Sequence, residues 1–174
     1  MKSRRTGRGG GEIGLLLHLL DEAYGKAAWH GPNLEGSLRG VNARQAAWRP
    51  AKGRHNVREL AMHAAYWKSV VRRRLTGEGK GHFPIAGSNY FDLPAPTEKT
   101  WRDEREILDR QHRALRAAVA AFSPDRLESV LPGTRKRTAL REIAGIAMHD
   151  VYHAGQIQLV KALRKKTRAR RTVL

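Results

Sequence analysis

The chain has 174 residues, 40% of them apolar, and its 34 Lys and Arg against 16 Asp and Glu give a formal net charge of +18. This length suits one domain with a hydrophobic core, and no apolar run approaches the roughly 20 residues that cross a bilayer. We therefore expect no membrane partner. No secretory apolar segment follows the basic N-terminus, which favours the cytoplasm. The absence of cysteine excludes a protein thiolate as nucleophile or metal ligand.

The positive charge is concentrated at the two ends of the chain. Four basic residues lie in residues 1–11 and seven in residues 161–174, with no acid in either segment, and removing these eleven leaves +7. We expect a basic flexible tail at residues 1–11, one domain at residues 12–165 and a basic tail at residues 166–174. Weak attraction of the tails to nucleic acid is the alternative, because clustered Lys and Arg attract phosphates.

Apolar residues at steps of three and four predict a first helix over residues 13–29. The run Gly9–Gly11 before it predicts a flexible entry, and Gly31-Pro32 predicts its end. Residues 31–55 are expected to form a connection with short helical pieces. Within it, Asn42 and Gln45 have the spacing of a capping box, in which each side chain accepts a hydrogen bond from the other residue's backbone N–H.

A second capping box, Asn56 with Glu59, predicts a helix that starts at Asn56 and ends at Gly77. His63 lies at the flank of its apolar stripe and is expected to point inward beside the core. Residues 77–97 contain four glycines and three prolines, so no helix is expected there. Fully extended, this segment could reach about 70 Å. It could cross over the length of a helix, cover a pocket, or both.

A third helix is predicted from about residue 98 to residue 122, with Thr100–Asp103 as its start signal and Ser123-Pro124 as its stop. Thr138 is a suitable N-cap for a last helix over residues 138–166. Four helices without any strand pattern predict an all-α, four-helix bundle. The long crossover between the second and third helices would make those two helices parallel.

His149 and His153 lie four residues apart in the last predicted helix, so both rings leave one face about one turn apart. Their neighbours are apolar, and imidazoles in such surroundings need partners. Together with His63 they predict a three-histidine metal site, although surface or satisfied core histidines often show the same spacing. Gln156 lies one turn further along, where it could hydrogen-bond a ligand histidine or a bound water. Capping of a neighbour's backbone, or exposure to solvent, is the simpler alternative for this side chain.

The sequence predicts the positions of the other residues near this pair less specifically. Tyr152 could lean toward the site, whereas Asp150 is expected on another face. Gly155 costs up to about 1 kcal/mol in a helix, so we expect close helix packing to explain it. His30 and His55 lie in connections that could approach the mouth of the bundle, but surface positions are expected first. No carboxylate can be placed beside the three histidines, so the catalytic residues are unknown.

The segment His149–Ile157, HDVYHAGQI, resembles the last-helix signature of the DinB-like superfamily. Upstream segments match the family in the same order: Ala28–Pro32, Trp48–Pro50, Asn56–Trp67 and Leu75–Gly77. The likeness covers most of residues 13–165. It implies a four-helix bundle of up-down-down-up topology, in agreement with a crossover at residues 77–97. It also implies a divalent metal ion held by His63, His149 and His153.

The resemblance further implies a metal-dependent enzyme with a small-molecule substrate. Characterised members of the superfamily include transferases and isomerases that use bacillithiol, mycothiol or similar thiols. A thiol-dependent S-transferase or a hydrolase is therefore expected, and any thiol would be an external low-molecular-weight one. The sequence does not distinguish Zn, Ni, Fe and Mn, and the family precedent favours a homodimer. The competing interpretation is a non-enzymatic metal-binding or interaction bundle whose basic tails associate with nucleic acid.

Overall fold

The computed structural model describes residues 8–79, 81 and 83–172, and within these residues the protein is all-helical, as predicted. Its helices are α1 (Arg8–Tyr24), α2 (Leu34–Leu38), α3 (Ala43–Ala46), α4 (Val57–Thr76), α5 (Glu98–Ala120) and α6 (Ala139–Thr172), with a 3-10 turn, η1 (Pro124–Arg126), between α5 and α6. The described residues form no strand. They contain only two isolated bridges, Ser88 with Tyr90 and Val130 with Thr138.

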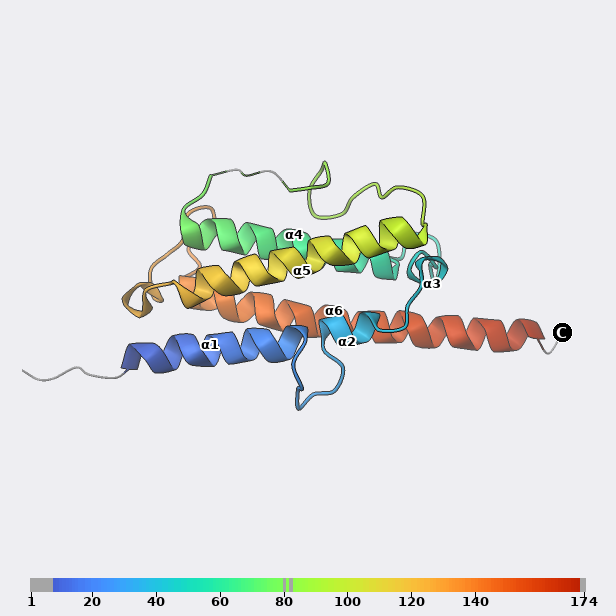
Figure 1. Cartoon of the computed structure of the whole chain (residues 1–174), viewed down its shortest axis with the longest axis horizontal. Coiled ribbons are helices and arrows are strands. Elements are labelled where there is room, and N and C mark those ends of the chain that lie inside the picture. The colour runs from blue at the N-terminus through green and yellow to red at the C-terminus, as the bar shows by residue number, and fades with distance from the viewer. Residues whose placement is uncertain (1–7, 80, 82, 173–174) are drawn as a thin grey trace, which may run out of the picture.

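The four long helices lie side by side (Figure 1). Helix α4 packs against α5 and α6, and α1 packs against the same two helices. In Figure 1, α4 ends and α5 begins at opposite ends of the molecule, and the described part of residues 77–97 runs between them. The described residues of this connection form no helix, as its glycines and prolines predict. It is nevertheless held against the helices, because Phe83 and Phe91 are buried in the core.

Three helices begin with a capping box. The two predicted boxes are confirmed: Asn42 with Gln45 opens α3, and Asn56 with Glu59 opens α4. The start signal of α5 was placed three residues too late, because its N-cap is Thr97, whose side chain accepts from the Thr100 backbone N–H. Thr100 therefore acts as the inner partner of the box rather than as the cap itself.

Helix α1 differs from the prediction at both ends. It begins at Arg8, so Gly9–Gly11 are helical and do not form a flexible entry. It ends at Tyr24 rather than near residue 29, and Trp29 is 98% exposed. The chain turns away there because the backbone N–H groups of Gly25 and Lys26 both bond the Asp21 carbonyl. The Asn33 side chain then donates to the Lys26 carbonyl at 2.5 Å, which fixes the turn.

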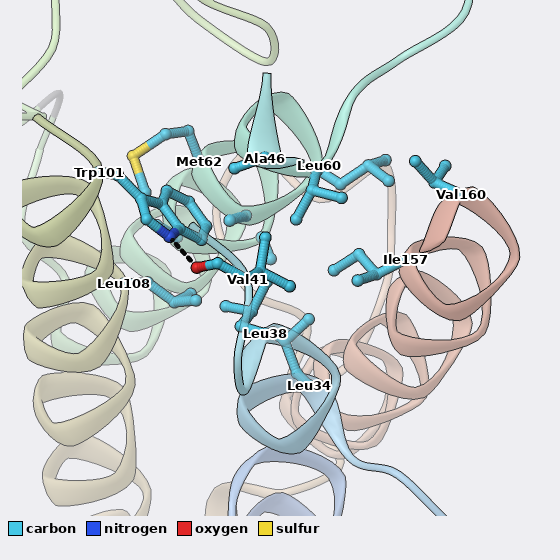
Figure 2. Close-up of a cluster of buried hydrophobic side chains, with 14 of the residues drawn as sticks. Leu34, Leu38, Val41, Ala46, Leu60, Met62, Trp101, Leu108, Ile157 and Val160 are labelled. Carbon is cyan, nitrogen blue, oxygen red and sulfur yellow. Dashed lines mark hydrogen bonds between the residues drawn. The ribbon is translucent and has the colours of Figure 1, made fainter. Parts of the chain in front are cut away.

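One of two buried clusters joins the short helix α2 to the long helices (Figure 2). Leu34 and Leu38 of α2 lie among side chains of α4, α5 and α6, including Leu60 and Ile157. The indole N–H of buried Trp101 donates to the Val41 carbonyl at 2.7 Å. This bond satisfies a polar atom within an otherwise apolar region. The second cluster is formed mainly by side chains of α1, α4, α5 and the first half of α6.

Two buried ion pairs join α4 to its neighbours. Arg58 donates to Glu104 of α5 through Nε at 2.8 Å. Lys68 bonds Asp150 of α6, and both side chains are 0% exposed. The Lys68 ammonium also lies 5.1 Å from the ring centroid of Tyr24. As expected, Asp150 is directed away from the histidines on either side of it in sequence, and its pair fixes α4 against α6.

Helix α6 extends beyond the predicted end at residue 166 and continues to Thr172 (Figure 1). Much of the expected C-terminal tail is therefore helical. Ile143, Ala147, Ala154 and Ile157 of α6 are buried. The expected N-terminal tail lies largely outside the described residues. Among the helices of the described part, none combines the length and apolarity required to span a membrane.

Candidate metal centre

Three histidines from two helices meet at one point between α4 and α6. The Nε2 atom of His149 lies 3.1 Å from Nε2 of His63 and 3.0 Å from Nε2 of His153. Each ring offers a nitrogen, and these nitrogens all lie within 4.8 Å of one another. His63 is 86 positions from His149 and 90 from His153 in the chain, and the fold brings the three residues together as predicted. The buried Lys68–Asp150 pair joins the same two helices next to this group.

The His63 ring is oriented by the connection between α4 and α5. Its Nδ1 donates to the Asn89 carbonyl at 3.0 Å, so Nε2 carries the free lone pair. Asn89 adopts a positive φ of 62°, which asparagine tolerates better than most residues. Its side-chain oxygen accepts from the Trp67 indole N–H at 3.0 Å. The ring of Tyr90 stacks on His63 with centroids 4.5 Å apart.

Gln156 orients the second ring, as expected from its place one turn beyond His153. The His153 Nδ1 donates to the Gln156 side-chain oxygen at 2.6 Å, which again leaves the lone pair on Nε2. The Gln156 amide nitrogen donates to the Tyr152 hydroxyl at 3.1 Å. Tyr152 is largely exposed, but its ring lies edge-on to that of His153 with centroids 5.2 Å apart.

His149 lies between the other two rings and differs from them. Its Nδ1 is buried and has no hydrogen-bond partner among the described protein atoms. Its Nε2 faces two nitrogens that both carry lone pairs, and at most one proton could be shared among them. Acceptor nitrogens at 3.0–3.1 Å repel one another unless a cation lies between them. The arrangement therefore fits a bound cation better than a protein-only hydrogen-bond network.

Burial lowers the pKa of all three histidines. The pKa of His149 falls to about 3, with the neighbouring rings adding to the effect of burial. The pKa of His153 falls to about 4 for the same main reason, and that of His63 is also lowered. The rings are consequently neutral at pH 7, and neutral imidazole is the form that binds metal ions.

Two of the three nitrogen spacings, those of His149 to His63 and to His153, fit a first-row metal ion. With metal–nitrogen bonds of about 2.1 Å, two ligands at 90° are about 3.0 Å apart and two at a tetrahedral angle about 3.4 Å. The separations of 3.0 and 3.1 Å fall in this range. Three histidines in the described part of the chain could thus hold one divalent ion, leaving coordination positions for other ligands.

A cavity of about 650 Å³ opens beside the three histidines. His63, His149 and Asn89 line it together with apolar and basic side chains of α4 and α6. A carboxylate, Glu142, also lines the cavity, but Arg74 donates to it at 2.6 Å. The structure therefore adds a binding volume that sequence patterns did not reveal.

The other described histidines lie outside the three-ring group. His55 approaches it indirectly, since its ring stacks on Tyr90 at 3.8 Å and Tyr90 in turn covers His63. His30 is exposed, as expected. His112 is buried and stacks on a core tyrosine rather than lying at the surface. His18 pairs with Glu22 on the exposed face of α1, and residue 82 lies outside the described residues.

Sequence reasoning missed Asn89 and Tyr90 and misjudged Gly155. The segment around Asn89 has turn composition, but composition does not show which side chain a loop will contact. Gly155 is exposed, and a Cβ added there would meet no atom within 4 Å. Close helix packing therefore does not explain this glycine, and nothing in the structure requires it.

An all-helical protein with three converging imidazoles has the arrangement from which helical bundles can build metal sites between facing helices. The sequence model of the DinB superfamily matches residues 27–157. This match covers more than half of the chain, so the protein belongs to the DinB superfamily. No curated protein matches the chain, and no solved structure matches it.

Proposed function

We propose that this protein is a metal-dependent enzyme whose single divalent ion is bound by His63, His149 and His153. The observation that carries the proposal is the convergence of three Nε2 atoms, two of them oriented by hydrogen bonds at Nδ1. Membership of the DinB superfamily supports it. When bound, such an ion supplies Lewis acidity and favours the deprotonated form of a coordinating group.

The protein's own residues would bind and orient a small-molecule substrate. The cavity beside the histidines is large enough for a compact organic molecule, and Asn89 and Trp67 line it next to His63. The proposed reaction is either thiol-dependent S-transfer or hydrolysis. Because the chain has no cysteine, a thiol reactant would be a separate small molecule.

We also propose that α1, α4, α5 and α6 form the up-down-down-up bundle that the family resemblance implies. The opposite placement of the end of α4 and the start of α5 in Figure 1 supports this topology. The domain limits at residues 12–165, a homodimer and a cytoplasmic location remain proposals of the same kind.

Elemental analysis of the purified protein tests the metal proposal. Wild type is expected to carry about one equivalent of Zn, Ni, Fe or Mn, and His149→Ala is expected to lose it, because removing one of three ligands weakens binding strongly. His30→Ala is the matched control, since that histidine is exposed and far from the group in sequence. Equal metal content in wild type and His149→Ala would refute the assigned ligands.

A second function, binding of nucleic acid without catalysis, is favoured by one specific observation. Arg39, Lys161, Arg164 and Lys165 line a cavity of about 330 Å³ beside the C-terminal half of α6, and its lining residues include no carboxylate. Binding of duplex DNA that weakens with salt and is lost in Arg164→Gln/Lys165→Gln would support this function. Binding unchanged by the double substitution would contradict it.

A further inference from the structure

The cavity beside the three histidines is bounded by two matching helical stripes. On α4 the stripe is His63, Trp67, Val71 and Arg74, and on α6 it is His149, Gly145 and Arg141, beside three apolar neighbours. Residues three or four apart share a helix face, so each stripe follows one face. Both begin at a metal-ligand histidine and end at an arginine.

The two poles of the cavity differ in chemistry. The histidine pole presents the imidazole rings of His63 and His149, whereas Arg74, Arg137 and Arg141 line the other pole. Between them lie apolar surfaces, among them those of Trp67 and Met148, and Met148 is 68% exposed. An exposed apolar side chain inside a cavity favours an apolar portion of a ligand.

The arginine pole carries uncompensated positive charge. Glu142 is the acid there, and it is paired twice, with Arg74 at 2.6 Å and with the Arg137 Nε at 2.5 Å. Arg141 is exposed and has no carboxylate within ion-pair distance among the described residues. One carboxylate thus opposes three guanidinium groups. The pole is suited to an anion, which a guanidinium binds through charge-assisted hydrogen bonds.

The distance between the two poles of the cavity can be calculated from the rise per residue of α6. Arg141 and His149 are eight residues apart on α6, which corresponds to about 12 Å along the helix axis. A ligand that reaches both poles therefore needs an anionic group and a metal-binding donor separated by several carbon atoms. A smaller anion such as free phosphate could contact only one pole.

We propose that this cavity selects a small amphipathic anion, with its carboxylate or similar group at Arg141, its apolar body against Trp67 and Met148, and its reacting end at the histidines. The statement that the ligand reacts at the histidines rests on the proposed function. The anion pole itself is formed by residues that do not bind the metal. Binding at this pole can therefore be measured whether or not the histidines carry an ion.

Octanoate and its neutral isostere octanamide are suitable probes, because they share an apolar chain and differ in charge. Isothermal titration with the full-length protein is expected to show octanoate binding about tenfold more tightly than octanamide. Arg141→Gln is expected to weaken octanoate by about fivefold to tenfold and to leave octanamide unchanged. Gly145→Leu is expected to weaken both probes, since a Cβ at this cavity-lining glycine meets no atom within 4 Å and the added side chain would fill the space.

Arg110→Gln is the matched control, because Arg110 is exposed on α5 and its loss changes the net charge equally. It is expected to leave both affinities unchanged. The proposal is overturned if the two probes bind equally, if neither binds at millimolar concentration, or if Arg110→Gln acts like Arg141→Gln.

The same titrations with His149→Ala separate the two proposals. Octanoate binding that persists in this variant supports the anion pole even if metal analysis shows that the histidines hold no ion. Metal content that depends on His149, combined with no preference for octanoate, would instead support the metal site and refute the anion pole.

Discussion

Replacement of Lys68 by methionine is expected to destabilise the fold by about 3–5 kcal/mol at pH 7. Lys68 and Asp150 are both 0% exposed and bond each other across α4 and α6. Methionine fills a similar volume but leaves the Asp150 carboxylate without its cation. The other carboxylate oxygen, Oδ1, has no partner among the described protein atoms, so no neighbour can compensate.

The magnitude can be worked out from the protonation of Asp150. The variant can avoid a buried charge by protonating this carboxyl, whose ordinary pKa is 3.8. At pH 7 that costs about 4 kcal/mol, at 1.36 kcal/mol per pH unit. Burial already raises the pKa of Asp150 to about 6 in the intact pair, so below about pH 6 folded wild type binds the same proton. The stability deficit of the variant should therefore shrink as the pH falls from 7 to about 6 and change little below that pH.

Urea denaturation with a chelator present measures this deficit without a contribution from bound metal. The double variant Lys68→Met/Asp150→Leu should recover most of the loss, because an apolar pair can replace a buried ion pair at little cost. A deficit below about 1 kcal/mol in Lys68→Met, which is less than the expected cost of a stranded charge, would refute the reasoning. So would a double variant whose loss equals the sum of the two single losses.

Three further predictions concern single side chains. Burial is the main cause, and the charge of Lys68 the second, of a pKa of His112 that is lowered to about 3. Between pH 6.5 and about 3 only the unfolded chain takes up this proton, so wild type should lose stability as the pH falls through this interval. His112→Phe keeps an aromatic ring against Tyr24, and its urea midpoint should vary less over this interval; equal pH dependence would contradict the burial argument. Gly155→Ala should stabilise the protein by about 0.5–1 kcal/mol, and a lower melting temperature would show that the glycine has an unrecognised contact. Gln156→Ala should weaken metal affinity by about 10-fold to 100-fold, and an unchanged affinity in a competition titration would exclude its orienting role.

Local signals predicted the parts of the fold that depend on neighbouring residues. The capping boxes at Asn42 and Asn56 were predictable because both partners lie within four residues of each other. The pairing of His149 with His153 followed from one helical turn. The same reasoning placed Gln156 beside His153, since a residue three positions on lies on the same face.

The remaining features depend on contacts between distant segments. No local pattern shows that Asn89 accepts from His63, 26 residues away, or that Lys68 pairs with Asp150, 82 residues away. The early end of α1 depends on Asn33, which lies beyond the predicted helix. Such contacts are set by how the helices pack, and a residue's type alone does not determine them.

X-ray absorption spectroscopy of the metal-loaded protein tests the central claim most directly. The account predicts three imidazole nitrogens at about 2.0–2.1 Å from a single metal ion, falling to two in His63→Ala measured with excess metal to offset its weakened binding, with wild-type coordination retained in His30→Ala. A metal that is bound with the same number of imidazoles in wild type and His63→Ala would contradict it, because α4 and α6 would then not share the ion.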